Sequence, residues 1–490
     1  MTIEVISGDI MERPNIFSLA GSEITFDTDV EADIADVVQA VVEADFEVGP
    51  KTNVPPPRDN YNLSTALGII RRMETSSARS AVFTEIKNKN SAYRMVDTLY
   101  TKAGSRVVQP LVLFAYMLKC VLSLGSFDYD DQETVSISNF HNETNAIAQL
   151  VSLLPGARIM QLSLKRGHIF RRGQLRTTLT MVGAATRVFP YLSRLARSYG
   201  FMPSARIASG LAYYIRFSQL FAQHPKLGTA IVASNYSPEA LGLAAAAHAM
   251  NRKLIYINHA PVPANGAMVP PVLADCAVFY GDAIRKTYEN ASRCNADVAL
   301  IGQPGTTRRM EWRDKIRKVG IFLTALTSAD AVEKLVSTIN DSNPDVQILI
   351  RNHPVALLKA DFSDLAAKHK NVEITIGTPL DYEIEACDLI FCGNSGVAMN
   401  ILRGGRPVAY IDSLDRLNHD YCGFIQDRLV CEVKNWSEDL YPMLKAFYTG
   451  PAWRNVMQSY DASYNSDATV LKQNAAQKIQ LYLSPQPAQG

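Results

Sequence analysis

Two short stretches, Arg351-Asn352-His353-Pro354 and Gly393-Asn394-Ser395-Gly396, decide how this chain of 490 residues is interpreted. Each follows an apolar run, Val346-Gln347-Ile348-Leu349-Ile350 before the first and Asp388-Leu389-Ile390-Phe391-Cys392 before the second. Runs so rich in large and β-branched residues predict buried strands of a parallel sheet. Because Pro354 cannot donate to a strand ladder, we expect the first strand to end at His353.

The segment after the second stretch predicts a helix. Residues 396–403, Gly-Val-Ala-Met-Asn-Ile-Leu-Arg, have a helical pattern, and Ser395 is placed as the helix cap. Both stretches then lie at the carboxyl ends of strands, where open α/β sheets bind their ligands. A cation, an imidazole, a hydroxyl and a helix N-terminus converging at one edge predict a phosphate site.

This arrangement resembles the nucleotide-sugar-binding half of the two-Rossmann (GT-B) glycosyltransferases. It is most similar to the bacterial enzymes that build capsules, sialylated or Kdo-containing glycans and teichoic acids. The resemblance rests on His353-Pro354, Asn394-Ser395 and Gly404-Gly405-Arg406-Pro407-Val408, within residues 229–412. It implies a nucleotide-sugar donor, often a cytidine nucleotide, and no other cofactor. The donor-binding residues it implies are Arg351, His353, Pro354, Asn394, Ser395 and Gly396.

Strands alternating with helices predict an α/β fold with two Rossmann-like lobes of the GT-B type and a mainly helical N-terminal region. We expect an N-terminal region at 1–130, an acceptor-side lobe at 131–305, a donor-side lobe at 316–435, and helices with a tail at 436–490. The first lobe opens with Thr134–Ser138 and a helix from Thr144, and further strands follow at 158–162, 230–233, 254–257, 277–280 and 298–301. In the resembled fold, the last helices cross back onto the first lobe.

Glycosyl transfer requires that the leaving phosphate is held, that the acceptor hydroxyl loses a proton, and that both substrates are aligned in a dry cleft. His353 is the candidate ligand of the phosphate, and its alternative is a histidine that merely ends a strand. His259 follows the strand Leu254–Ile257 and is a candidate base or ligand, or else a histidine of a surface loop. Glu143 is a second candidate base, with His141 as its rival, or simply an acid of the first helical turn.

The composition excludes several classes of function. A net charge of +1 gives no argument for a nucleic-acid partner. Seven scattered cysteines without a Cys-x-x-Cys pair predict reduced thiols in the cytoplasm and no zinc site. We interpret Asp128-Tyr129-Asp130-Asp131 as a solvated turn, not as a metal motif, and expect no metal requirement. The N-terminus lacks the pattern of a signal peptide.

Two features leave room for peripheral membrane association. The most apolar stretch, Leu111–Leu124, contains Lys119 and is too short to span a bilayer, so it predicts a buried or an interfacial helix. The basic stretch from Lys165 to Arg176 is either a solvated surface or a contact for an anionic acceptor or membrane.

The sequence therefore predicts a cytoplasmic, metal-independent, inverting glycosyltransferase. Its donor would be a nucleotide-sugar, such as CMP-activated sialic acid or Kdo, and its acceptor a hydroxyl of a surface glycan or glycoconjugate. Two alternatives stay open, a sugar-nucleotide epimerase of the same architecture and a non-catalytic nucleotide-sugar-binding subunit. The acceptor, the linkage and the oligomeric state are not predicted.

Overall fold

The computed structural model describes residues 16–19, 22–25, 61–104, 107–124, 132–164, 172–265, 268–305, 307–324, 327–353, 361–375, 377–415 and 420–483. Some of the sequence predictions lie outside these residues. They are the acidic turn at 128–131, the basic residues at 165–171, Pro354 and the last residues of the 436–490 region, 484–490.

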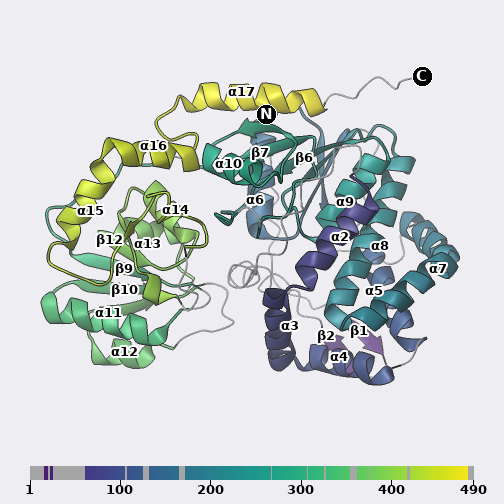
Figure 1. Ribbon diagram of the computed structural model, residues 1–490, viewed down its shortest axis with the longest axis horizontal. Coiled ribbons are helices and arrows are strands. Elements are labelled where there is room, and N and C mark those ends of the chain that lie inside the picture. Colours follow the sequence, from purple (N-terminus) through teal and green to yellow (C-terminus); the bar gives the residue numbers. More distant parts are fainter. Residues whose placement is uncertain are drawn as a thin grey trace.

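Two six-stranded parallel sheets form the two Rossmann-like lobes, as predicted (Figure 1). The first sheet has the strand order β4-β3-β5-β6-β7-β8 and the second has the order β11-β10-β9-β12-β13-β14. Their central strands are buried, because helices cover both faces of each sheet. The strands of the first lobe are β3 (Thr134–Ser138), β4 (Ile159–Ser163), β5 (Thr229–Val232), β6 (Lys253–Ile257), β7 (Cys276–Phe279) and β8 (Asp297–Leu300). Those of the second lobe are β9 (Lys318–Phe322), β10 (Gln347–Arg351), β11 (Val372–Thr375), β12 (Leu389–Cys392), β13 (Val408–Tyr410) and β14 (Cys431–Glu432).

The strand orders fix where each lobe can bind a ligand. In the first sheet the order reverses between β3 and β5, and in the second it reverses between β9 and β12. Doubly wound sheets bind ligands at this switch point, outside the carboxyl ends of the strands. The loops that matter most are therefore those after β3, β5, β9 and β12.

Two boundaries differ from the sequence predictions near these loops. Strand β10 ends at Arg351, two residues before His353, because its last pairs are with Phe322 of β9 and Thr375 of β11. Helix α6 (His141–Ser152) begins three residues earlier than predicted, because Phe140 adopts the extended conformation of an N-cap. His141 and Glu143 thus belong to the first helical turn and not to a loop.

The remaining helices of the first lobe connect its strands or lie behind them. Helix α9 packs on β5 and β6, and α8 and α2 pack on α9. The apolar helix α5 buries Leu113 and Met117, while Leu111 stays half exposed. Helices α2–α5, α7 and α8 form the layer on the right of Figure 1 and share one hydrophobic core with the first sheet. These helices are α2 (Leu63–Glu74), α3 (Ser77–Lys89), α4 (Ser91–Ala103), α5 (Val108–Ser123), α7 (Arg172–Ser198), α8 (Phe201–Gln223), α9 (Pro238–Ala249) and α10 (Asp282–Asn290).

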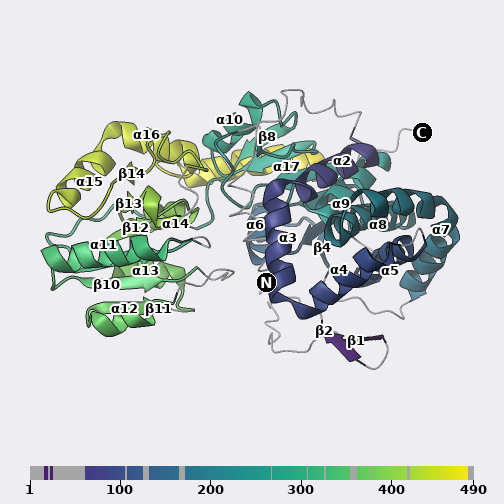
Figure 2. The ribbon, with the colours of Figure 1, turned by 60° about the horizontal axis from the view of Figure 1, so that its bottom comes forward.

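The second lobe has a core of its own and is followed by helices that return to the first lobe. Helix α17 packs on β6 and β8, and Thr229 Oγ1 donates to the Tyr482 carbonyl at 2.7 Å. Figure 2 shows α17 running from the second lobe across the first. The helices are α11 (Ala329–Ser342), α12 (Ser363–Lys368), α13 (Leu380–Ala386), α14 (Val397–Arg403), α15 (Leu440–Thr449), α16 (Pro451–Tyr460) and α17 (Ala468–Leu483); a hairpin of β1 (Ile16–Leu19) and β2 (Ser22–Thr25) lies near the N-terminus.

No helix among the described residues has both the length and the hydropathy needed to cross a bilayer.

Candidate functional site

A cavity of about 420 Å³ lies between the lobes, at the carboxyl ends of both sheets. The first lobe contributes the start of α6, the loop after β6 and residues around α10. The second lobe contributes one face of α14 and the loop at Cys422 and Phe424. Contributions from both lobes make this cavity the candidate active site.

His259 lies on the first-lobe wall of the cavity. Its Nδ1 lies 2.5 Å from the Ala233 carbonyl, at the end of β5. Since a carbonyl only accepts hydrogen bonds, this contact assigns the proton of the neutral ring to Nδ1 and leaves Nε2 as the acceptor. The structure therefore places His259 at the interlobe site, held in the tautomer that suits a general base.

Glu143 lies under the wall of the cavity and not on it. Its neighbours Asn142 and Asn145 line the cavity, whereas Glu143 itself is 3% exposed. Its Oε2 accepts from the Asn139 backbone N–H at 2.7 Å. This contact gives Glu143 a clear structural role at the start of α6, and its catalytic role stays a prediction.

The Gly393–Gly396 turn lies at the switch point of the second sheet and touches the first lobe. A Cβ on Gly396 would meet Pro261 Cγ at 2.9 Å, so the two lobes approach closely here. A backbone hydrogen bond of 2.7 Å from Ala264 to Tyr421 adds a second link between the lobes. The sequence predicted Ser395 as the N-cap of α14, but the N-cap is Gly396. Ser395 Oγ still accepts a hydrogen bond from the Val397 N–H at 3.3 Å.

Asn394 offers a donor at the same turn. Its side chain is buried, and Oδ1 accepts from the Tyr421 N–H at 3.2 Å. Its Nδ2 is also buried and has no hydrogen-bond partner among the described residues. A buried amide donor without a partner costs about 1–3 kcal/mol, which a ligand oxygen would recover.

Arg351 and His353 lie at the same sheet edge but do not meet Ser395 directly. In the sheet, β9 separates β10 from β12, so their ends are about 10 Å apart at two strand spacings. The loop between them, after β9, includes Thr324, whose N–H donates to Thr327 Oγ1 at 3.0 Å. The two motifs alone do not indicate this loop, because they do not encode the strand order that places β9 between β10 and β12.

The Arg351 side chain is held within the second lobe. Its guanidinium donates to the Thr378 carbonyl at 2.7 Å and forms an ion pair with Glu383, which is 1% exposed. These contacts neither require nor exclude a ligand at Arg351, so its contact with a donor phosphate stays a prediction. His353 is half-buried, and Pro354 lies outside the described residues.

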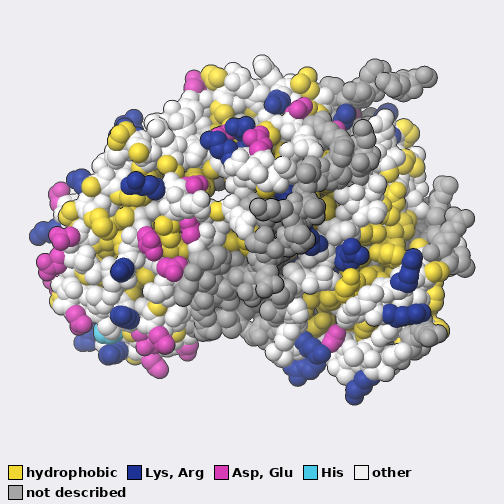
Figure 3. Space-filling model, viewed as in Figure 1, with side chains coloured by type: hydrophobic (Ala, Val, Ile, Leu, Met, Phe, Trp, Pro, Cys, Tyr) yellow, Lys and Arg dark blue, Asp and Glu magenta, His cyan; other side chains and the backbone are white. Residues whose placement is uncertain are grey.

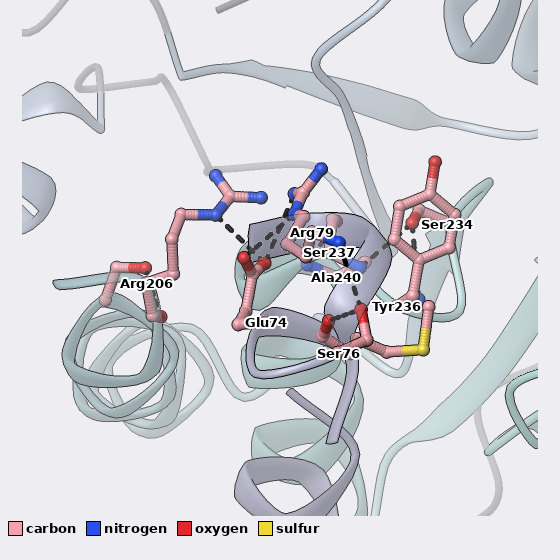
Figure 4. Close-up of polar contacts among 10 residues, drawn as sticks. Glu74, Ser76, Arg79, Arg206, Ser234, Tyr236, Ser237 and Ala240 are labelled. Atoms are coloured by element: carbon pink, nitrogen blue, oxygen red, sulfur yellow. Dashed lines mark hydrogen bonds and ion pairs between the residues drawn. The ribbon is translucent and has the colours of Figure 1, made fainter. Parts of the chain in front are cut away.

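Glu239, at the start of α9, is a buried carboxyl of the first-lobe switch point. Burial raises the pKa of Glu239, the neighbouring Glu143 raises it further, and Arg206 opposes the shift. Figure 4 shows Arg206 and Arg79 on either side of Glu74, close to the turn from Ser234 to Ser237. Two carboxyls of different environment therefore lie near each other behind the cavity wall, at Glu143 and Glu239.

Arg403 lines the cavity and was not singled out from the sequence. Three other residues at the start and in the middle of α14 line the cavity as well, namely Gly396, Met399 and Asn400. Together with Arg403 they have the spacing i, i+3, i+4 and i+7 of one helical face. Burial lowers the pKa of the Arg403 guanidinium, and Asp461 counteracts this. This spacing is the only feature of the sequence that could indicate that Arg403 lines the cavity. It is not sufficient, because the sequence of a short apolar helix does not show which of its faces points to a cleft.

The comparisons with known proteins give fold likeness only. No family model and no curated protein sequence matches this chain. Among solved structures, the UDP-GlcNAc 2-epimerase from Neisseria meningitidis bound to UDP-GlcNAc is 13% identical, with a TM-score of 0.43 over 71% of this chain and 98% of that one. The calicheamicin glycosyltransferase CalG4 is 11% identical, with a TM-score of 0.41 over 72% and 98%. The glycosyltransferase SnogD from Streptomyces nogalater is 14% identical, with a TM-score of 0.39 over 72% and 100%. At these identities and scores, the reactions of those proteins are not carried over to this chain.

Proposed function

We propose that this chain is a nucleotide-sugar-dependent glycosyltransferase. The observation that carries the proposal is the cavity between the lobes, which has an oriented imidazole on one wall and the start of α14 on the other. The imidazole suits the acceptor hydroxyl, and the α14 end suits the donor phosphate. In this proposal, each of the two facing walls serves one of these two chemical requirements of the transfer.

In the proposed reaction, His259 Nε2 takes the proton of the acceptor hydroxyl as its oxygen attacks the anomeric carbon. The bond from that carbon to the donor phosphate breaks, and its electron pair leaves with the nucleotide. The backbone N–H groups at the start of α14, Ser395 and the Asn394 amide would offset the growing charge, with His353 toward the other end of the phosphates. One displacement without a covalent intermediate inverts the anomeric configuration.

The donor and the acceptor follow from the motif resemblance. We propose a CMP-activated acidic sugar, such as sialic acid or Kdo, as the donor, and a hydroxyl of a surface glycan or glycoconjugate as the acceptor. The proposed enzyme requires no metal, because the phosphates are held by protein donors, and it works in the cytoplasm.

A thermal-shift screen against CMP, CDP, UDP and GDP tests nucleotide binding directly. A ligand that binds the folded chain at 100 times its Kd stabilises it by about 2.7 kcal/mol. A rise of the melting temperature with CMP and not with UDP or GDP supports the proposed donor. No rise with any of the four nucleotides would contradict a nucleotide-sugar enzyme.

A sugar-nucleotide epimerase is the second candidate, and the neighbouring carboxyls of Glu143 and Glu239 favour it. Epimerisation at a carbon requires one group that removes a proton and one that returns it, and Glu239, whose pKa is raised by burial, suits the part of the protonated group. Incubation of the nucleotide-sugar in D₂O without acceptor separates the two candidates. Deuterium entering the sugar indicates an epimerase, whereas consumption of donor only in the presence of an acceptor indicates a transferase.

A further inference from the structure

An apolar surface on the helices beside the first lobe is not explained by the proposed reaction. Seven of the eleven large apolar side chains that are exposed in the described residues lie on or next to α4, α5 and α7. They are Met95, Leu99, Val107, Val108, Leu111, Leu179 and Val182, with exposed fractions between 44% and 63%. We call these seven residues the apolar helix surface.

The three helices are already packed on their other sides. Tyr93 and Tyr100 of α4 are buried against Phe201, and α5 buries Leu113 and Met117. Helix α5 lies between α4 and α7 and contacts both. These helices are therefore apolar on an inner face that the core satisfies and on an outer face that no described residue covers. Large apolar side chains exposed on three neighbouring helices are typical of an interaction surface.

The charges on the helices of the apolar helix surface are mostly positive. Helices α5, α7 and α8 contain no Asp or Glu, and the single acid of α4, Asp97, is paired with Lys87 at 2.6 Å. Lys102 lies on the same face of α4 as Met95, and Arg197 is five full turns from Leu179 on α7. Figure 3 shows Lys and Arg side chains beside the yellow side chains on the right of the molecule.

We propose that the apolar helix surface docks the protein on an anionic membrane. Exposed Leu, Met and Val side chains enter the headgroup and acyl boundary, and Lys102 and Arg197 contact anionic headgroups. A soluble protein partner would need its own apolar patch together with acidic residues, whereas a bilayer with anionic lipid supplies both properties at once. The inference is independent of the reaction proposed above, because it concerns a different surface.

The full-length chain is tested by sedimentation with vesicles. Vesicles of phosphatidylcholine alone are compared with vesicles in which part of it is replaced by phosphatidylglycerol. We expect binding to the anionic vesicles only, with a strong decrease at high salt. Absence of binding to the anionic vesicles, or equal binding to both kinds, would overturn the proposal without any variant. Either result leaves the nucleotide and transfer assays unaffected.

Matched variants locate the surface. Leu99→Glu, Leu111→Glu and Leu179→Glu each put a charge on one helix of the apolar helix surface, and we expect each to lower the vesicle partition coefficient at least tenfold. Lys102→Glu and Arg197→Glu should lower it about fivefold or more each, which is the worth of one basic residue near the surface. Leu481→Glu and Lys472→Glu, on α17, are the controls and should bind as the unaltered chain does; Leu481 is 74% exposed.

Two other results would contradict the proposal. Equal losses in the α17 controls would show that binding is not located on the apolar helix surface. A dimer in light scattering that Leu99→Glu dissociates, without vesicle binding by the unaltered chain, would assign the surface to a second copy of the chain. Circular dichroism and the melting temperature of each variant identify any loss that is due to unfolding.

Discussion

His259 is the residue whose replacement tests the catalytic geometry most sharply. His259→Asn retains an amide donor near the position of Nδ1, so the 2.5 Å contact with the Ala233 carbonyl can persist. It removes Nε2, the proposed base. We therefore expect turnover to fall by about 10²–10⁴, while the affinity for the donor nucleotide stays nearly unchanged. His259→Ala removes both nitrogens and should cause the same loss of turnover.

The two variants are expected to differ in stability. His259→Ala removes the donor that contacts the Ala233 carbonyl, and Ala233 is almost fully buried. The loss of this hydrogen bond should lower the free energy of unfolding by about 1–3 kcal/mol. His259→Asn should cost clearly less. The free energy of unfolding from denaturant titration, donor affinity by calorimetry and turnover with saturating acceptor are measured for both variants.

Glu143→Gln is the comparison that assigns the base. Gln retains an acceptor for the 2.7 Å hydrogen bond from Asn139, so the start of α6 should be preserved. If Glu143 is structural, this variant turns over as the unaltered chain does. The reasoning is refuted if His259→Asn keeps normal turnover, and the base moves to Glu143 if Glu143→Gln loses turnover instead.

Three further predictions concern stability and metals. Burial raises the pKa of Glu239 in the folded chain. As the pH rises, the unfolded chain therefore loses the proton of this carboxyl at a lower pH than the folded chain does, and the free energy of unfolding decreases. Glu239→Gln should therefore raise the melting temperature above about pH 4.3, increasingly toward the folded pKa, and leave it unchanged below; a constant difference across pH would contradict this. Asp461 is fully buried and accepts hydrogen bonds from Gln303, Thr307 and Ser463, so Asp461→Ala should cost about 3–5 kcal/mol in denaturant titration and Asp461→Asn less, whereas equal stability would refute its role. Excess EDTA should leave activity intact, and a loss that magnesium or manganese restores would show a metal requirement.

The strands of both lobes could be predicted from the sequence because buried parallel strands are nearly continuous apolar runs. Thr134–Ser138 was predicted to the residue, and the other predicted strands were located within one or two residues. Strand β14 (Cys431–Glu432) was missed, because two residues carry no periodic signal. Strand β11 (Val372–Thr375) was missed because its exposed Glu373 interrupts the apolar run.

The site was predicted less completely than the fold, because it depends on the order of strands and not on their existence. The sequence indicated both the Gly393–Gly396 turn and the His259 loop, and the structure brings Gly396 against Pro261. It gave no means of knowing that β9 lies between β10 and β12, which separates His353 from Ser395. Ion pairs between distant residues, such as Arg351 with Glu383, likewise depend on packing that no local pattern encodes.

Hydrogen exchange of the full-length chain, with and without the nucleotide that the thermal-shift screen selects, tests the central claim most directly. If the donor phosphate binds at the second-lobe switch point, the backbone amides of residues 393–403 should gain the strongest protection, with weaker protection around His259 on the facing wall. Protection confined to the first lobe, with residues 393–403 exchanging as in the free chain, would contradict the account.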